Sequence, residues 1–291
     1  MSELPYSSNY NILKLVGQGQ FGRVFCAVHR QNGKLLALKE FAHQRFSTKI
    51  FLRELHFLAI LQHPNVITFH GLEHTPTGRF LVMDYCEGGT LRNLMQLNEQ
   101  LSLVYGLKFI ADILSGLEYA HSRGIVHCDI KPENVLLSLD ASGWIARLSD
   151  FGIARIYNEL SSQKHMCTGS PAYMAPERFY GEYSSASDLY AVGVMLYELA
   201  VGYRPFSGLP AQLMTAHLNQ PVKIPDTVPF LLRSAILTAM QKLPNNRFRS
   251  AAQMLKSVQL ATEVERITHG SIPPLSVPNV DNLVSSLEEG V

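Results

Sequence analysis

The chain has 291 residues, of which 46% are hydrophobic and 17% charged, and it contains 20 glycines and 15 prolines. This composition excludes a disordered or collagen-like chain and provides enough apolar residues for a large core. There are 25 lysines and arginines against 24 aspartates and glutamates, so charge gives no reason to expect nucleic acid or an anionic membrane as a partner. We expect a globular protein of two domains or one domain of two lobes.

The four cysteines, Cys26, Cys86, Cys128 and Cys167, form no CxxC pair and have no histidine at metal-ligand spacing. We interpret them as reduced thiols, which favours a cytoplasmic location. The first residues lack the basic and apolar regions of a secretory signal. The longest apolar run, 190–201, is shorter than the roughly 20 residues of a membrane span, so we expect a buried helix and no membrane span.

The first part of the chain is rich in β-forming residues. Asn32-Gly33 between two such runs predicts a hairpin with a type I′ turn, and therefore antiparallel strands. Segment 47–61 has apolar residues at helical spacing, which predicts a helix. Strands are expected at 11–16, 24–30, 34–41, 66–69 and 79–85.

After Glu87-Gly88-Gly89 the pattern becomes helical. An apolar stripe predicts a long helix that includes 103–117 and is stopped by Arg123-Gly124. Further helices are expected at 187–201, 230–242 and 251–265. These elements divide the chain into a small sheet-rich lobe at 1–86, a helical lobe at 87–265, and a tail or linker at 266–291, which we predict to be disordered.

A glycine-rich segment, Gly17-Gln-Gly19-Gln-Phe-Gly22-Arg-Val24, lies between two predicted strands. Glycines at this spacing let backbone N–H groups approach phosphate oxygens, although by itself such a segment is equally well a hairpin loop. A dinucleotide-binding Rossmann unit would continue into a helix. The strand that follows this loop therefore argues against that fold.

Lys39 shares a strand face with Leu35 and Ala37, which places an amine on a largely apolar surface. An isolated strand lysine is usually solvated, but this placement calls for an anionic partner. Glu54 lies in the predicted helix that follows. The glycine loop, Lys39 and Glu54, in this order, resemble the small lobe of the eukaryotic-type (Hanks-type) protein kinase family.

The second half of the chain contains the further motifs that this resemblance requires, in the required order. They are His127-Cys-Asp129-Ile-Lys131-Pro-Glu-Asn134, Asp150-Phe-Gly152, Ala175-Pro-Glu177, Asp188 and Arg247. The resemblance covers about residues 10–265. It implies an α+β, bilobal protein-kinase-like fold with a small antiparallel sheet lobe plus one helix and a larger, mostly helical lobe. Short loops resemble those of bacterial members, and Arg247 is expected as the buried partner of Glu177.

The resemblance also implies how the chain would bind ATP and Mg²⁺. Lys39, held by an ion pair with Glu54, would bind the α- and β-phosphates. Asp150 would bind the metal ions that bridge the phosphates, and Asn134 would supply a neutral second ligand.

The acceptor side of the site follows from the same resemblance. Asp129 would accept a hydrogen bond from the substrate hydroxyl, and Lys131 would neutralise charge on the moving phosphoryl group. Ser170 stands where relatives carry a threonine that bonds to the catalytic aspartate and lysine. The Asp-Ile-Lys-Pro-Glu-Asn loop resembles that of serine/threonine kinases, so we expect protein substrates with serine or threonine acceptors, and autophosphorylation as well.

The resemblance assigns an adenine pocket to mostly apolar residues, although such residues are commonly core even in a kinase. Backbone groups of Asp84 and Cys86 would meet the base edge, and Met83 would lie at the rear of the pocket. The remaining nucleotide-binding residues are expected to be Val16, Gly17, Gly19, Gly22, Val24, Ala37 and Leu136.

Two positions depart from the family pattern. Many relatives carry arginine directly before the catalytic aspartate, where this chain has Cys128, and the usual phosphorylation site corresponds to Met166, which has no hydroxyl. The loss of both groups predicts a non-RD kinase, one without that arginine, whose activity does not need phosphate at this position. A separate hypothesis makes Cys128 and Cys167 a redox pair, against the usual behaviour of free cysteines as small hydrophobes.

Two other functions are consistent with part of the pattern. A pseudokinase scaffold would bind nucleotide or partner without transfer, but such a protein is expected to lack one of Lys39, Asp129 or Asp150. A small-molecule phosphotransferase of related architecture is the other alternative. Ala175-Pro-Glu177 and the segment around Ser170, which would support a peptide, argue against it.

Overall fold

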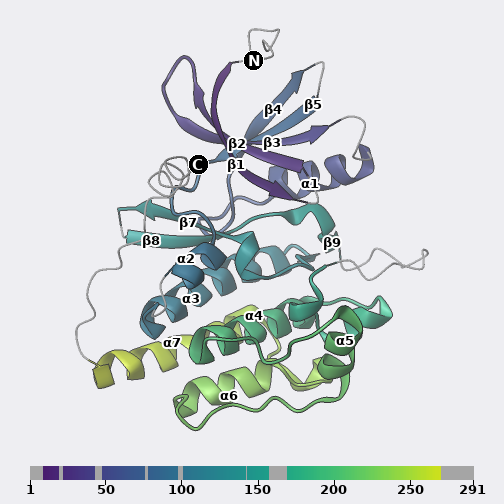
Figure 1. Cartoon of the computed structure of the whole chain (residues 1–291), viewed down its shortest axis with the longest axis vertical. Coiled ribbons are helices and arrows are strands. Elements are labelled where there is room, and N and C mark those ends of the chain that lie inside the picture. Colours follow the sequence, from purple (N-terminus) through teal and green to yellow (C-terminus); the bar gives the residue numbers. More distant parts are fainter. Residues whose placement is uncertain are drawn as a thin grey trace, which may run out of the picture.

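The computed structural model describes residues 9–19, 22–42, 48–75, 78–97, 101–141, 143–156 and 169–269. Two lobes lie one above the other along the long axis of the molecule (Figure 1). The upper lobe is a β-sheet with one helix, and the lower lobe is mostly helical. The expected α+β architecture, with a small antiparallel sheet lobe plus one helix and a larger, mostly helical lobe, is therefore confirmed.

The small lobe is built on a five-stranded antiparallel sheet with the order β1-β2-β3-β5-β4. Its strands are β1 (Tyr10–Gly19), β2 (Gly22–His29), β3 (Leu35–Ala42), β4 (Phe69–Thr75) and β5 (Gly78–Asp84). β3 lies in the middle of the sheet, where Lys39 pairs with Val24 on one side and Leu81 on the other. The central strand thus carries the lysine that the sequence analysis selected.

Two details of the predicted small lobe are wrong. The β2–β3 hairpin forms, but Asn32 has a negative φ and only Gly33 is left-handed (φ 70°), so the turn is not type I′, which requires a positive φ at both residues. A strand was predicted at 66–69, whereas β4 begins at Phe69 and Val66 forms only an isolated bridge to Leu148. Val66 is apolar and buried in the main core. Periodicity alone cannot distinguish a short buried apolar segment of this kind from a strand.

Helix α1 (Thr48–Ile60) packs beside the sheet and agrees with the prediction at 47–61. Its buried residues include Phe51, Glu54 and Phe57, which recur at helical spacing on one face. Glu54 is therefore carried on the apolar face of α1, directed toward the interior rather than toward solvent.

The large lobe contains most of the helices. They are α2 (Leu91–Leu97), α3 (Leu103–His121), α4 (Ser185–Val201), α5 (Pro210–Asn219), α6 (Phe230–Ala239) and α7 (Ala251–His269). Most residues of α4 are buried, from Ser187 to Glu198, because other elements surround this helix on several sides. This confirms the buried helix predicted for 190–201. No helix in the described ranges is long and apolar enough to cross a membrane.

Short elements at the boundary of the lobes hold the polar loops. They are β6 (Ile125–Val126), η1 (Pro132–Asn134), β7 (Val135–Asp140), β8 (Gly143–Leu148), η2 (Phe151–Ile153) and β9 (Arg155–Ile156), and beyond them η3 (Pro171–Tyr173), η4 (Pro176–Tyr180) and η5 (Pro244–Asn246). The β7–β8 hairpin, α2 and α5 were not predicted. Helix α7 continues to His269, beyond the predicted end at residue 265, and residues 270–291 lie outside the described residues.

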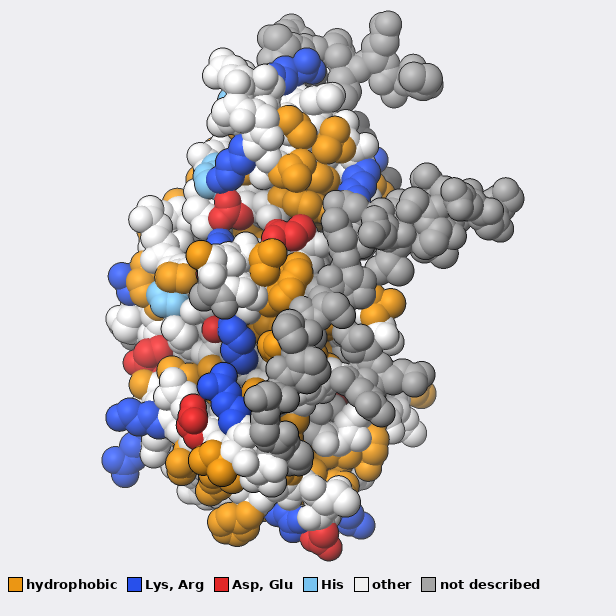
Figure 2. Space-filling model, turned by 90° about the vertical axis from the view of Figure 1, so that its left-hand side faces the viewer, with side chains coloured by type: hydrophobic (Ala, Val, Ile, Leu, Met, Phe, Trp, Pro, Cys, Tyr) orange, Lys and Arg blue, Asp and Glu red, His pale blue; other side chains and the backbone are white. Residues whose placement is uncertain are grey.

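Among the described residues on the face drawn in Figure 2, acidic and basic side chains are interspersed, and they form no large area of one sign of charge. This agrees with the net charge of +1. The polar groups that the sequence analysis selected lie instead between the lobes.

Candidate active site

Lys39 lies between two carboxylates from different parts of the chain. Its Nζ donates to Glu54 Oε1 at 2.6 Å and to Asp150 Oδ1 at 3.0 Å. The exposed fraction of the side chain rises from 1% at Glu54 to 9% at Lys39 and 24% at Asp150. Glu54 is therefore the interior anchor of this group, and Asp150 is its solvent-facing end.

The surroundings keep Lys39 charged. Burial alone would lower the pKa of Lys39, but the charges and hydrogen bonds of Glu54 and Asp150 raise it above its usual value. Burial raises the pKa of Glu54, although Lys39 opposes that shift. Burial would also raise the pKa of Asp150, but the charge of Lys39 holds it below its ordinary range. The site thus presents an ammonium and an ionised carboxylate side by side.

The backbone places Asp150 in this position at a cost. Asp150 has a left-handed conformation (φ 63°) immediately before η2, which is uncommon for residues other than glycine and persists where the surroundings enforce it. A Cβ at Gly152 would lie 3.3 Å from Asp150 Oδ1 and 3.4 Å from Glu54 Oε2. A side chain at position 152 would therefore crowd both carboxylates.

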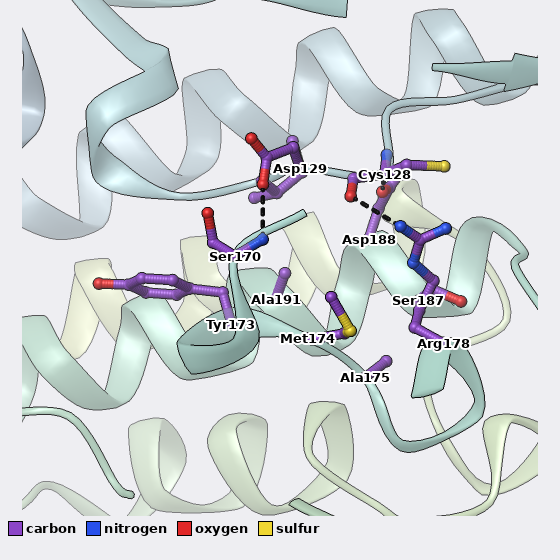
Figure 3. A pocket seen from close by; sticks show the side chains of 11 residues that line it. Cys128, Asp129, Ser170, Tyr173, Met174, Ala175, Arg178, Ser187, Asp188 and Ala191 are labelled. Carbon is purple, nitrogen blue, oxygen red and sulfur yellow. Dashed lines mark hydrogen bonds between the residues drawn. The ribbon is translucent and has the colours of Figure 1, made fainter. Parts of the chain in front are cut away.

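A second polar group is built around the carboxylate of Asp129. Lys131 Nζ lies 2.8 Å from Asp129 Oδ2 and also donates to Ser170 Oγ at 2.8 Å. Asn134 Nδ2 donates to Asp129 Oδ2 at 3.0 Å, and the Ser170 N–H donates to Oδ1 at 3.1 Å (Figure 3). Each predicted acceptor-side residue thus contacts this carboxylate directly or through Lys131.

Backbone bonds connect the two polar groups. The carbonyl of Asn134 accepts from the N–H of Ser149 at 2.9 Å and from its Oγ at 3.0 Å. His127 Nε2 donates to the Ser149 carbonyl at 2.9 Å, and its ring lies 4.6 Å from that of Phe151. Because Ser149 directly precedes Asp150, these bonds fix the distance between the Asp129 group and the Lys39 group.

Asp188, on α4, holds the loop that carries Asp129. Its Oδ2 accepts from the His127 N–H at 2.8 Å and from His121 Nε2 at 2.9 Å, and its Oδ1 accepts from the Cys128 N–H at 2.9 Å. Burial would raise the pKa of Asp188, but these bonds hold it below its usual value. A buried, ionised carboxylate therefore fastens the loop to the core of the large lobe.

The segment after Ser170 is fastened by a buried ion pair, as the sequence analysis predicted. Arg247 Nη1 and Nη2 donate to the two oxygens of Glu177, both at 2.7 Å. Ser187 Oγ donates to the same carboxylate at 2.7 Å. The segment that carries Glu177 is thereby joined to α4 through Ser187 and to the chain before α7 through Arg247.

The glycine loop has the strand-to-strand context that was predicted. Gly17 pairs with Val24, and Gly19 pairs with Gly22, across β1 and β2. Residues 20–21, at the tip of the loop, lie outside the described residues. Val16, one residue before the loop, is 39% exposed, so it is not part of the sheet core.

The residues predicted for the adenine pocket lie on neighbouring elements. Ala37 pairs with Met83 across β3 and β5, and both are buried. Leu136, in β7, is partly buried and packs against the main core. Cys86 is buried, and its carbonyl accepts from the Gly89 N–H at 3.3 Å. Ala37 lies two residues before Lys39 on β3, and Leu136 and Cys86 lie outside this sheet.

Asp84 has a polar surrounding that sequence reasoning missed. Its N–H donates to the Thr68 carbonyl at 3.0 Å. Its carboxylate accepts from His70 Nε2 at 2.6 Å, from Lys34 Nζ at 3.3 Å and from Arg147 at 2.9 Å. Burial opposes the shift, but these partners hold the pKa of Asp84 below its usual value. The partners are far apart in sequence, and no pattern marked them.

A second missed group surrounds Arg92 on α2. Its guanidinium donates to Glu133 at 2.8 Å, to Glu198 at 2.9 Å and to the Tyr173 hydroxyl. Arg92 therefore ties α2 to the Asp129 loop and to α4. The small helix α2 was not predicted, so its arginine gave no signal in the sequence.

Cys128 lines a pocket beside Asp129, together with Met174, Arg178 and Asp188 (Figure 3). Burial raises the pKa of its thiol to about 12, so the sulfur is neutral, which argues against a redox role. Cys167 and Met166 lie outside the described residues. The other cysteines of the described part, Cys26 and Cys86, are buried.

The two polar groups together could bind a metal nucleotide. A carboxylate at Asp150 and an amide at Asn134 offer the oxygen ligands that Mg²⁺ prefers, and phosphates would complete the coordination. No cluster of three or more histidine, cysteine, aspartate or glutamate side chains suited to a metal occurs within the described ranges. The chain's donor set thus fits a metal delivered with phosphates rather than a metal held by protein ligands alone.

Comparisons with known proteins agree with this geometry. The family model described as protein kinase domain matches residues 10–273. Probable serine/threonine-protein kinase PknB of Lactococcus lactis is 31% identical over 273 residues, 90% of this chain and 43% of the relative. Calcium/calmodulin-dependent protein kinase type II of Caenorhabditis briggsae is 35% identical, over 86% of this chain and 48% of the relative. Serine/threonine-protein kinase PkaA of Streptomyces coelicolor is 33% identical, over 89% and 51%.

The chain therefore belongs to the protein kinase family, with serine/threonine protein kinases among its relatives. It spans about half the length, or less, of these curated relatives. The similarity covers the matched kinase region and both lobes described here.

Proposed function

We propose that this chain is a protein kinase that transfers the γ-phosphoryl group of ATP to serine or threonine hydroxyls of proteins. The observation that carries the proposal is the Asp129 carboxylate, held by Lys131, Asn134 and the Ser170 N–H. A carboxylate so oriented is suited to accept a hydrogen bond from an incoming hydroxyl.

The nucleotide would bind between the lobes. Lys39, kept cationic by Glu54 and Asp150, would bind the α- and β-phosphates, and backbone N–H groups of the glycine loop would cover them. The adenine would lie between Val24 and Ala37 on one side and Leu136 on the other. Val16 and Met83 would border the pocket. The Asp84 carbonyl would face the base, because the Asp84 N–H already donates to the Thr68 carbonyl. Cys86 would offer a backbone group.

Mg²⁺ is part of the proposal, with Asp150 and Asn134 as its protein ligands. The ion, when bound, would neutralise charge on the phosphates. The residues of the chain supply the remaining positioning: Lys39 holds the phosphates, and the backbone bonds between Asn134 and Ser149 keep both ligands in register.

In the transfer step, Asp129 would accept a hydrogen bond from the acceptor hydroxyl and orient its oxygen toward the γ-phosphorus. The bond from this oxygen to phosphorus forms as the bond between the γ-phosphorus and the β–γ bridging oxygen breaks, and ADP leaves. The hydroxyl proton passes to Asp129 or to solvent after the new bond has formed. Lys131, which contacts both Asp129 and Ser170, would neutralise charge on the moving group.

Other features of the proposal go beyond the site geometry. The Asp-Ile-Lys-Pro-Glu-Asn loop and the relatives, which are serine/threonine-protein kinases, support serine and threonine as acceptors. The non-RD assignment rests on Cys128, and activity without phosphate at Met166 stays a prediction, as does autophosphorylation. We assign nucleotide binding to residues 1–86 and catalysis and substrate binding to 87–269, since α7 ends at His269 rather than at the predicted residue 265, with a tail or linker after it. The cytoplasmic location also stays a prediction.

The test is an acceptor competition. The full chain is incubated with γ-labelled ATP and Mg²⁺, together with matched peptides whose single hydroxyl is on serine, threonine or tyrosine, and separately with a mixture of hydroxylated metabolites. We expect label on the serine and threonine peptides. Label confined to tyrosine peptides would refute the acceptor assignment. Label only on metabolites would favour a small-molecule phosphotransferase, and nucleotide binding without transfer would favour a scaffold.

A further inference from the structure

The residue directly before Asp129 has an unusual backbone conformation. Cys128 is left-handed, with φ 70°, a region that residues other than glycine rarely adopt and that costs free energy unless the surroundings hold it. Its N–H donates to Asp188 Oδ1 at 2.9 Å, and its carbonyl accepts from Arg178 Nη2 at 3.3 Å (Figure 3). Cys128 is therefore held at its N–H by an anion and at its carbonyl by a cation.

The bond from Arg178 acts on the same peptide group that begins Asp129. The Cys128 carbonyl and the Asp129 N–H belong to one planar unit. The N–H end donates to His127 Nδ1 at 3.3 Å, while the carbonyl end is bound by Arg178. Fixing both ends fixes the rotation of the plane, and with it the direction in which Asp129 leaves the backbone.

Arg178 is well placed for this role because it belongs to the anchored part of the large lobe. Arg178 directly follows Glu177, which is held by Arg247. Arg178 is itself only 9% exposed. A buried guanidinium is costly unless its N–H groups are paired. The bond to Cys128 is thus part of a built interior arrangement and not a chance surface contact.

The backbone of Gly169 also lies close to the Cys128 carbonyl. A Cβ on Gly169, which has φ 116°, would lie 3.2 Å from the carbonyl oxygen and 3.5 Å from Asp129 Oδ1. The backbone before Ser170 thus approaches both the peptide and the carboxylate closely. The Cys128 thiol is neutral, since burial raises its pKa to about 12, and its Sγ bonds only weakly to the Val126 carbonyl at 3.5 Å.

We propose that Arg178 is a positioning residue for phosphoryl transfer. By binding the Cys128 carbonyl, it holds the peptide from which Asp129 presents its carboxylate to the acceptor hydroxyl. The proposal rests on the proposed function of the site. Arg178 lies in η4, remote in sequence from the glycine loop and from Lys39, so its loss should lower kcat without weakening the binding of ATP.

The experiment compares the full-length wild type with Arg178→Met, which has a similar length and no N–H donor, and with Arg178→Lys, which keeps a cationic donor. Arg233→Met is the matched control, because Arg233 on α6 contacts the exposed Asp226. For each protein we would measure kcat, the KM for ATP and for peptide, the Kd of a fluorescent ATP analogue, and Tm.

We expect Arg178→Met to lower kcat by about tenfold or more, the range for loss of one hydrogen bond to a charged group. The Kd for the nucleotide should stay within about twofold of wild type, and Arg178→Lys should recover part of kcat. Arg233→Met should behave like the wild type. If Arg178→Met does not fold, Arg178→Gln retains an uncharged donor, and the expected order of kcat is wild type, then lysine, then glutamine.

Three results would overturn the proposal. One is a kcat within twofold of wild type for Arg178→Met. Another is an equal loss of kcat and nucleotide binding with a large drop in Tm and no recovery by Arg178→Lys, which would indicate a purely structural role. In the third, wild type itself transfers no phosphate to any acceptor, and the proposed function then fails together with the inference.

Discussion

Substituting Arg247 by lysine tests whether the large lobe depends on a fully paired guanidinium. Its Nη1 and Nη2 each donate to one oxygen of the Glu177 carboxylate. Its Nε, Nη1 and Nη2 also donate to the backbone carbonyls of Gln241, Ala186 and Lys242, respectively, and all five distances are 2.7 to 2.9 Å. Arginine has five N–H donors and lysine three, so Arg247→Lys loses at least two of these five hydrogen bonds.

The expected loss of stability follows from the lost hydrogen bonds, because lysine keeps the positive charge beside Glu177. Each hydrogen bond lost in this buried site costs about 1–3 kcal/mol. For two lost bonds we therefore expect Arg247→Lys to lower the free energy of unfolding by about 2–6 kcal/mol, a large part of the roughly 5–15 kcal/mol typical of a folded domain. The expected fall in Tm is about 4–24 °C at about 2–4 °C per kcal/mol.

Urea unfolding followed by circular dichroism measures this effect. Arg249→Lys is the matched control, since Arg249 lies nearby and is exposed, and it should change stability by less than about 0.5 kcal/mol. If Arg247→Lys costs less than about 1 kcal/mol, the reasoning from donor pairing is refuted.

The same ion pair predicts a dependence on pH. Burial opposes the shift, but the hydrogen bonds and charge of Arg247 hold the pKa of Glu177 below its usual value. A lowered pKa in the folded state contributes stability above the unfolded pKa, about 4.3 for glutamate, and this stability is lost as pH falls below it. Arg247→Met should therefore show a smaller loss of stability between about pH 5 and 3 than wild type. Identical acid profiles would contradict this.

Three further predictions concern the site. Lys39→Met should lower kcat/KM by about a hundredfold. Glu54→Gln should cause a smaller loss, because Glu54 acts through Lys39. Steady-state kinetics with labelled ATP measure both variants, and equal losses would contradict these roles. Ser170→Ala should lower kcat about tenfold, whereas Ser170→Thr should retain activity, because the hydroxyl accepts from Lys131; an alanine variant as active as wild type would remove Ser170 from the site. Cys128 should resist iodoacetamide at pH 8 in the folded protein and react after unfolding, since a pKa of about 12 leaves almost no thiolate. Mass spectrometry after timed labelling measures the reaction. Rapid labelling of Cys128 in the native protein would contradict the argument from burial.

The residues proposed for catalysis could be selected from the sequence because their chemistry imposes fixed residue types at fixed spacings. Lys39, Asp129 and Asp150 were selected in this way, and the structure brings Lys39 to Asp150 and Asp129 to Lys131. Arg247 and Glu177 were paired by resemblance, and their bonds are confirmed. In each case a short local pattern carries the information.

Contacts between distant segments could not be predicted from local patterns. The partners of the Asp84 carboxylate come from β4, from β8 and from the turn before β3, and Arg92 reaches Glu198 across the large lobe. Arg178 gave no signal either, because its role depends on the left-handed backbone of Cys128. The wrong strand at 66–69 has a similar origin, since a short buried apolar segment resembles a strand when only the sequence is known.

The most direct test of the central claim is phosphate transfer by Asp129→Asn in a single turnover. The wild type and the variant are mixed with γ-labelled ATP, Mg²⁺ and a serine peptide, and nucleotide binding is measured in parallel. The account predicts a loss of transfer rate of about a hundredfold or more with unchanged binding of the nucleotide. Transfer by Asp129→Asn at the wild-type rate would contradict the assignment of this carboxylate to the acceptor hydroxyl.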